Sequence, residues 1–375
     1  MLNLPITLQE KLNLRHENHS LRQLKTYSNL IDFSSNDYLG LAKSEALFEE
    51  VHLYLKQHAF HQNGSTGSRL ITGNHQLYEI LENFLSDFHQ TESALVFSSG
   101  FSANIGFFSS VPQKNDVVIY DEYSHASIRE GLLLSQAKSY KFKHNNIEDL
   151  VRLLSKKQPF QNVYVVTESV FSMDGDSPDF LALLALKKQY SFHLVVDEAH
   201  AVGVFGNQGK GLIQSLGIEK EIFARIITFS KAIGCHGGAV VGSKLLINYL
   251  INFARSFIYS TGLTPHTLAT ILLAYNKLKE NNENILKLKE NISYFGEEII
   301  KYKNDYKINN SSIQTVLFND VEEVKTKCKE LLEKGFHVVP ILSPTVPKGK
   351  ERIRLCLHTF NTKEEIKNLI QSIYK

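Results

Sequence analysis

Residues 192–200 read FHLVVDEAH, a short apolar run that leads into two acidic residues and a histidine. Similar runs recur along the middle of the chain: ALVFSSG (94–100), DVVIYDE (116–122), NVYVVTES (162–169), RIITFSK (225–231) and GAVVGS (238–243). Helical patterns separate several of them, including NIEDLVRLLSKK (146–157) and DFLALLALKKQYS (179–191). Strands that alternate with helices predict an α/β domain with a mostly parallel sheet, and near-continuous apolar strands are typical of burial on both faces.

Length and pattern divide the chain into parts. Its 375 residues exceed what a single hydrophobic core usually holds. We predict an N-terminal segment (1–45), a large α/β domain (46–262) and a C-terminal α+β domain (263–375). The C-terminal domain contains a long helical stretch at 266–303, and a charged helix is expected from Leu12 to about Lys25.

The composition excludes several classes of protein. A net charge of +2 offers little attraction for nucleic acid or an acidic membrane surface, and no stretch is long and apolar enough to span a bilayer. The N-terminal residues lack the apolar core of a signal peptide. Cys235, Cys328 and Cys356 are too widely spaced for a disulfide framework or a zinc motif, so we expect no metal and a reducing cytoplasm.

Polar or glycine-rich segments follow five of the apolar runs. In an open α/β sheet, ligands bind at the carboxyl ends of the strands. We therefore expect the residues after these runs to converge on one edge of one sheet: His125, Ser172, Asp197, His200 and Lys231. Each segment alone is weakly specific, and their convergence is the evidence for a site.

Two of these residues allow both a structural and a chemical role. Lys231 could be a surface residue at a strand end, but a partly desolvated amine has a lowered pKa and can form a Schiff base. Asp197 could cap the following helix. Beneath a pyridine ring it could instead keep the ring nitrogen protonated and so make the ring an electron sink. These residues alone leave both alternatives open.

Three further features have the same ambiguity. SSGFSANIG (98–106) is either an ordinary strand-to-helix turn or a helix start that binds phosphate. His125 is either a turn histidine or a ring that stacks on a cofactor. Arg352 and Arg354 share one face of RIRLCLH (352–358), which is either the solvent face of an edge strand or a guanidinium site for a substrate carboxylate.

The tetrapeptide DEAH (197–200) also occurs in helicases, together with a phosphate-binding GxxxxGK[ST] loop. The nearest candidate for that loop ends at Gly209 and Lys210. Val204 stands where its first glycine should be, and Gly211 follows the lysine. We therefore exclude a nucleic-acid motor.

A series of blocks, in order, resembles one family. They are FSSNDYLGL (33–41), GSTGSRLITGNH (64–75), SSGFSANIG, SHASI (124–128), TESVFSMDGD (167–176), DEAHAVGVFGNQGKG (197–211), TFSKAIG (228–234), FIYSTGLTP (257–265) and SPTVPKGKERIRLCL (343–357). The chain is similar to the α-oxoamine synthases, fold-type-I pyridoxal-phosphate (PLP) enzymes that condense an amino acid with an acyl thioester and release carbon dioxide. The resemblance implies a large domain with a mostly parallel seven-stranded sheet, a small α+β C-terminal domain and a short N-terminal segment.

The resemblance also implies a role for each matching residue. Lys231 would form the Schiff base with PLP and then act as acid and base, Asp197 would bind the ring nitrogen, and His200 the ring hydroxyl. His125 would stack on the ring and line the substrate site. The other implied contacts are Gly100, Phe101, Ser172 and Thr228 for the cofactor, Ser260 and Thr261 for the phosphate of the other subunit, and Arg22, Asn36, Thr345 and Arg354 for the substrate. The segment between Arg22 and Asn36 is shorter than the family pattern.

Within the family, FIYST (257–261) and SPTVP (343–347) are most similar to the biotin-pathway branch. That branch implies condensation of L-alanine with pimeloyl-CoA or pimeloyl-acyl carrier protein in a homodimer. Three sister branches remain as alternatives: glycine C-acetyltransferase, serine palmitoyltransferase and 5-aminolevulinate synthase. A catalytically silent regulatory subunit is an alternative of another class, but such a chain should have lost Lys231 or Asp197, and both are present.

Overall fold

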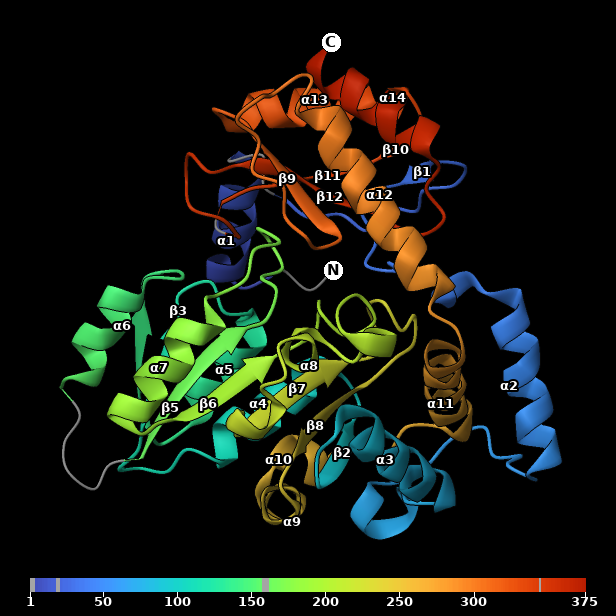
Figure 1. Cartoon of the computed structure of the whole chain (residues 1–375), viewed down its shortest axis with the longest axis vertical. Helices are drawn as coiled ribbons and strands as arrows, with labels where there is room; N and C mark the ends of the chain where they lie inside the picture. The colour runs from blue at the N-terminus through green and yellow to red at the C-terminus, as the bar shows by residue number, and fades with distance from the viewer. Residues whose placement is uncertain (1–3, 18–20, 157–161, 344) are drawn as a thin grey trace.

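A computed structural model describes residues 4–17, 21–156, 162–343 and 345–375 (Figure 1). Its largest feature is a seven-stranded sheet, which confirms the predicted fold class. The strands are β2 (Ser93–Phe97), β3 (Val117–Asp121), β4 (Lys138–Phe142), β5 (Val163–Glu168), β6 (His193–Asp197), β7 (Ala224–Thr228) and β8 (Gly238–Gly242). Their order across the sheet is β2-β8-β7-β6-β5-β3-β4.

Most neighbouring strands of this sheet run parallel, and only β8 runs antiparallel to its neighbours β2 and β7. The register aligns Glu168 of β5 with Asp197 of β6, and Asp197 with Ile226 of β7. The carboxyl ends of the central strands therefore lie side by side, as the convergence of polar segments predicted.

Helices cover both faces of the large sheet. One face packs against α4 (Gly100–Ser110), α5 (Ala126–Leu134), α9 (Lys244–Phe253) and α10 (Arg255–Ile258). The other packs against α6 (Ile147–Leu154), α7 (Phe180–Tyr190) and α8 (Leu212–Ser215). Successive residues of β6 alternate between the two cores, with Val195 in the first and Leu194 and Val196 in the second. Burial on both faces explains why the three middle residues of this strand are all apolar.

Strand β4, KSYKF, is the strand that the apolar runs did not predict. It lies at the edge of the sheet, beside β3 alone, and its first four residues are exposed. Edge strands often carry lysine, which discourages pairing with another chain. Because lysines occupy two of its five positions, the strand contains no apolar run from which it could be predicted.

The small domain holds an antiparallel sheet of three strands, ordered β11 (Val339–Ile341), β12 (Arg352–Cys356) and β9 (Ile313–Leu317). Its helices are α12 (Glu283–Ile299), α13 (Val321–Glu333) and α14 (Lys363–Tyr374). Because β12 is the central strand, Arg352 and Arg354 do not lie on the solvent face of an edge strand. Both are buried, with exposed fractions of 3% and 7%.

The N-terminal segment joins the small domain. Strand β1 (Ile31–Asp32) pairs in parallel with β10 (Phe336–His337). The remaining helices are α2 (Glu45–Gln57), α3 (Gln76–His89) and α11 (Pro265–Glu280), with short turns at Leu41–Lys43, Arg69–Gly73, Asn207–Gly209 and Glu219–Glu221. In Figure 1, α11 lies beside α2 and α12 leads from it to the small domain. The division at 262/263 stays a prediction.

The helix expected from Leu12 to about Lys25 is wrong in its limits. Helix α1 spans Ile6–Glu17, residues 18–20 lie outside the described part, and 21–27 have no regular structure. Pro5 precedes the first turn, and its carbonyl accepts hydrogen bonds from Leu8 and Gln9. No residue of α1 is buried, so no packed apolar face marked its ends in the sequence.

Candidate active site

A cavity of about 200 Å³, here called the active-site cavity, opens at the carboxyl ends of the central strands of the large sheet. Seven residues predicted from the sequence line it: Gly100, Phe101, His125, Asp197, His200, Thr228 and Lys231. Sequence analysis missed seven others: Ser99, Asn104, Ser127, Glu168, Ala199, Ile226 and Ser230. The predicted convergence therefore holds for the residues that follow β3, β6 and β7.

Asp197 is held rigidly at the end of β6, with only 5% of its surface exposed. Its Oδ2 accepts a hydrogen bond from Asn104 Nδ2 at 2.8 Å, and its Oδ1 accepts one from the Ala199 backbone at 2.9 Å. Asn104 also donates to Ser127 Oγ at 3.0 Å. Two fixed donors orient the carboxylate and help to offset the cost of burying it. Asn104 lies one turn into α4, and its distance from Asp197 in sequence hid this contact.

Lys231 lies in the turn after β7, where burial lowers the pKa of its amine and the nearby Arg354 guanidinium lowers it further. Within the described part of the chain, its amine has no hydrogen-bond or ion-pair partner. An amine with a lowered pKa loses its proton more readily and is a better nucleophile. This environment favours the chemical role of Lys231 over that of a surface residue.

His200 belongs to a buried polar network that reaches into the small domain. Its Nδ1 lies 2.7 Å from the Tyr38 hydroxyl, which donates to Asn36 Oδ1 at 3.1 Å. Arg354 donates to the same Asn36 oxygen at 2.8 Å and to the Ser172 carbonyl at 2.5 Å. Burial, followed by the nearby Lys231, holds the pKa of His200 well below its usual value, so its ring is neutral. Tyr38 was missed, although it stands in the block FSSNDYLGL.

His125 caps the N-terminus of α5 at the mouth of the cavity. Its Nδ1 lies 2.7 Å from Ser127 Oγ and accepts from the Ser127 backbone at 3.2 Å. Its own backbone donates to Glu168 Oε1 at 2.6 Å. Glu168 is buried, and burial together with Asp197 raises the pKa of its carboxyl well above the usual value. These contacts fix the ring of His125 and hold its backbone against the Glu168 carboxyl.

A close approach of backbones forms another wall of the cavity. Helix α4 begins at Gly100, and Ser99 and Ser102 form a capping box at its start. A Cβ on Gly100 would lie 2.9 Å from Thr228 Oγ1, and one on Gly238 would lie 2.6 Å from the Gly100 nitrogen. Glycine is therefore required at both positions. The helix N-terminus presents backbone N–H groups of the kind that bind phosphate.

The other predicted residues do not line this cavity. Ser172 and Arg354 contact each other beside it, and Thr345 lines a separate pocket between the domains. Ser260 is half-buried, and the exposed Thr261 forms an isolated β-bridge with Ser68. Arg22 is exposed in the extended segment after α1. Among the described residues, it has no hydrogen bond or ion pair, so nothing brings it to the predicted substrate site.

The fold and the cavity define a fold-type-I PLP transferase, and the comparisons with known proteins agree. The chain belongs to the aminotransferase class I and II family, whose model matches residues 28–373. A curated relative from Emericella nidulans, named 8-amino-7-oxononanoate synthase, is 39% identical over 98% of this chain and 94% of its own length.

Solved structures give the same result. The serine palmitoyltransferase of Sphingomonas wittichii superimposes with a TM-score of 0.88 at 27% identity, covering 98% of this chain and 96% of its own. The 8-amino-7-oxononanoate synthase of Francisella tularensis has a TM-score of 0.77 at 30% identity, covering 92% and 97%. The chain is thus an α-oxoamine synthase, an acyltransferase that depends on PLP.

The residues of the cavity fit this cofactor. The glycine-lined start of α4 leaves room for a phosphate, the oriented Asp197 carboxylate suits a protonated ring nitrogen, and Lys231 offers an unpaired amine. The described residues include no group of three or more histidine, cysteine, aspartate or glutamate side chains that could hold a metal ion. In that part of the chain, no helix combines the length and apolar character needed to cross a membrane.

His144 ties the loop that carries Ser172 to the large sheet. Its Nδ1 and Nε2 lie 2.9 Å from carboxylate oxygens of Asp121 and Asp176, and its ring stacks on Tyr123 at 4.3 Å. Although burial opposes the charged form, hydrogen bonds to the two aspartates raise the pKa of His144 to about 10. Its imidazole is therefore charged at neutral pH.

We expect His144→Gln to lower the free energy of unfolding by about 3 kcal/mol at pH 6, because it leaves two aspartates without their cation. The pKa of His144 is higher in the folded protein than in the unfolded chain. The stabilisation from its charge is therefore complete below about pH 6.5 and is lost as pH rises through about 10. Urea unfolding of both proteins at pH 6, 8 and 10.5 would measure the difference. A difference that stays constant with pH would contradict this assignment of charge.

Proposed function

We propose that the chain condenses L-alanine with a pimeloyl thioester and releases carbon dioxide, a free thiol and 8-amino-7-oxononanoate. The donor is pimeloyl-CoA or pimeloyl-acyl carrier protein, and the reaction belongs to biotin biosynthesis. The observation that carries the reaction type is Lys231, which lines one cavity with the buried, doubly hydrogen-bonded Asp197. The choice of substrates is supported by the name of the relative that is 39% identical over nearly the whole chain.

When bound, PLP supplies a ring that withdraws electrons from the α-carbon of the amino acid. We assign Asp197 to the ring nitrogen, His200 to the ring hydroxyl and His125 to the face of the ring. Thr228 and the turn at Gly100 and Phe101 line the same cavity and are assigned to the cofactor as well. Ser172 does not line it, and its contact with the cofactor stays a hypothesis. Two hydrogen bonds orient the side chain of Asp197 before substrate binds, so no free energy is needed to reorient it during the reaction.

Lys231 is the residue that we assign to proton transfer at the α-carbon. A general base works best when its pKa lies near the operating pH. Burial and Arg354 both lower the pKa of Lys231 in that direction. The same amine, once protonated, can return the proton to the product.

The amino-acid carboxylate is assigned to Arg354 and Asn36. Arg354 is buried, and its guanidinium is oriented by the Ser172 carbonyl and by Asn36 before any substrate binds. A pre-oriented guanidinium binds a carboxylate with little loss of side-chain freedom. The relation of Arg22 to the substrate stays a hypothesis, and its exposed position does not support it.

We also propose that the enzyme works as a homodimer in the cytoplasm. Ser260 and Thr261 lie outside the active-site cavity of their own chain. The family resemblance assigns them to the phosphate of the partner's cofactor. This assignment needs a second copy to complete the site.

A sister activity is the alternative, and one observation favours it. Serine palmitoyltransferase from Sphingomonas wittichii superimposes more closely, with a TM-score of 0.88, than the Francisella 8-amino-7-oxononanoate synthase does, at 0.77. Glycine C-acetyltransferase and 5-aminolevulinate synthase have the same chemistry. An inactive subunit is disfavoured, because Lys231 and Asp197 both line the cavity.

Free-thiol release by the PLP-reconstituted protein would decide among these activities. We expect alanine with pimeloyl-CoA to give the highest kcat/KM of a panel that includes glycine with acetyl-, succinyl- or palmitoyl-CoA and serine with palmitoyl-CoA. Mass spectrometry of the product would identify 8-amino-7-oxononanoate. Faster release with another pair would overturn the choice of substrates and leave the family assignment intact.

A further inference from the structure

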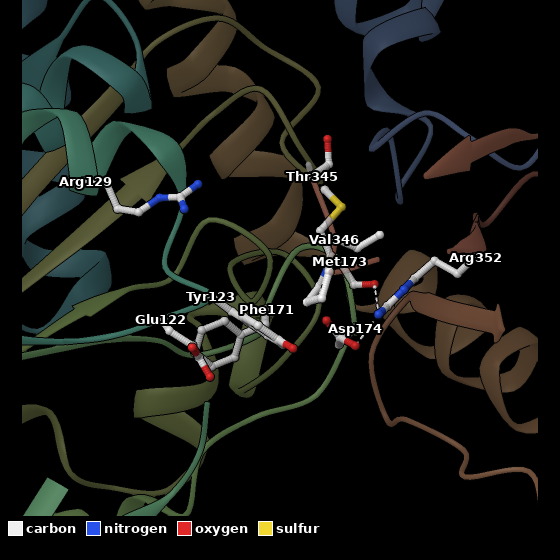
Figure 2. A pocket seen from close by; sticks show the side chains of 10 residues that line it. Glu122, Tyr123, Arg129, Phe171, Met173, Asp174, Thr345, Val346 and Arg352 are labelled. Carbon is white, nitrogen blue, oxygen red and sulfur yellow. Dashed lines mark hydrogen bonds and ion pairs between the residues drawn. The ribbon is translucent and has the colours of Figure 1, made fainter. Parts of the chain in front are cut away.

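A second, smaller pocket lies between the large and small domains, and we call it the interdomain pocket. Its volume is about 50 Å³. It is lined by the start of α5 and the residues before it, by the loop after β5, and by residues 345–347 and Arg352 of the small domain (Figure 2). The mechanism assigned above uses no side chain of this pocket.

The interdomain pocket adjoins the active-site cavity through α5. His125 caps this helix and lines the active-site cavity, whereas Arg129 lines the interdomain pocket. Residues four apart lie on the same face of a helix, one turn or about 5.4 Å along its axis. A second connection is the loop after β5, where Phe171 and Met173 line the pocket on either side of Ser172.

Of the two arginines that line the pocket, Arg129 is the one without an ion pair among the described residues. Asp174 is paired with Arg352, and Glu122 Oε1 accepts a hydrogen bond from the His144 backbone at 3.1 Å. Figure 2 shows the Arg129 guanidinium well apart from both carboxylates. Among the described residues, none forms an ion pair or side-chain hydrogen bond with Arg129. Arg129 is also exposed, so its guanidinium is available to a negatively charged group of a ligand.

The size and lining of the pocket suit the end of an acyl chain. About 50 Å³ exceeds the 10–15 Å³ that one water occupies by the same kind of measure, and is far too small for a nucleotide. Phe171, Met173 and Val346 offer apolar contacts for methylene groups, and Thr345 offers a hydroxyl. Apolar side chains in the same pocket as the guanidinium of Arg129 are complementary to a carbon chain that ends in a carboxylate.

We propose that Arg129 binds the distal carboxylate of a dicarboxylic acyl donor and so selects it over a neutral fatty acyl donor of the same length. This proposal rests on the proposed function, because it concerns the acyl group that reaches the active-site cavity. The chemical class it names is an α,ω-dicarboxylic thioester, of which the pimeloyl group is one. Arg129 thereby determines specificity, while Lys231 and Asp197 serve the reaction itself.

The test compares pimeloyl-CoA with heptanoyl-CoA, which has the same seven carbons but no distal carboxylate. With L-alanine as co-substrate, we expect Arg129→Gln to lower kcat/KM for pimeloyl-CoA by about 10- to 100-fold, mainly through KM, because one charge-assisted hydrogen-bonding partner is lost. The kcat/KM for heptanoyl-CoA should stay unchanged. Arg129→Lys, which keeps the charge, should recover part of the loss.

Arg152→Gln is the matched control, because Arg152 lies on α6 and pairs at the surface with Asp149. It should leave both rates at their wild-type values. An equal loss for both donors in Arg129→Gln, or an unaltered preference for pimeloyl-CoA, would overturn the role of Arg129 alone. A wild-type enzyme that uses neither pimeloyl-CoA nor pimeloyl-acyl carrier protein would instead overturn the proposed function and this inference with it.

Discussion

Replacing Lys231 with alanine is expected to abolish alanine-dependent thiol release, by at least about a thousandfold, because the main proton-transfer group of the cavity is removed. The variant should also lose the visible absorbance band of PLP bound through a lysine amine. No other lysine of the described chain lines the active-site cavity, so none can substitute at that position. Absorbance spectra after reconstitution and steady-state rates would measure the two effects separately.

Lys244 provides the matched control. It also follows a strand of the large sheet, β8, but its side chain is exposed at the start of α9. Lys244→Ala should keep both the absorbance band and the rate. A Lys231→Ala protein that keeps them as well would refute the assignment of Lys231, and circular dichroism would establish that the variant is folded.

The central strands of the large sheet were predictable because burial on both faces leaves a direct trace in the sequence. Val195 and Val196 point into different cores, so β6 contains no polar position between His193 and Asp197. Strand β4 has no such trace, since four of its five residues are exposed. Strand β4 forms because its backbone pairs with β3, and the composition of β4 does not indicate that pairing.

The site was predictable where the chemistry follows directly after a strand. Asp197 is the last residue of β6 and Lys231 follows β7, and parallel strands bring their carboxyl ends to one edge. Asn104 and Tyr38 were missed because their roles depend on hydrogen bonds to residues 93 and 162 positions away. An asparagine in a helix carries no sign of such a partner in the sequence.

Arg354 shows how tertiary structure decides between two interpretations. An alternating strand with two arginines fits a solvent face as well as a carboxylate site. Pairing of β12 with β9 and β11 on either side places the strand centrally and buries both arginines. A buried guanidinium needs partners, and Arg354 finds them in Ser172 and Asn36. The carboxylate site is the interpretation that this environment favours.

Asp197→Asn is expected to lower kcat by about a thousandfold or more, equivalent to about 4 kcal/mol of transition-state stabilisation. The substitution keeps the shape of the side chain but removes the charge that would hold a proton on the ring nitrogen of PLP. The Asn104 amide, which donates to Asp197 Oδ2, would then face either the new oxygen or the new NH₂ group. Steady-state kinetics at saturating alanine and pimeloyl-CoA would measure the loss, with PLP titration to separate weakened cofactor binding.

Asp116→Asn is the control for burial of an acid as such. Asp116 is also buried, but it precedes β3 at the opposite end of the sheet and accepts hydrogen bonds from Gln113 and Asn162. If the charge of Asp197 acts on the cofactor, the Asp116 variant should lose stability while keeping most of its rate. The Asp197 variant should lose most of its rate while keeping its stability. A loss of less than tenfold in Asp197→Asn would refute its role, because an uncharged amide would then serve the ring equally well.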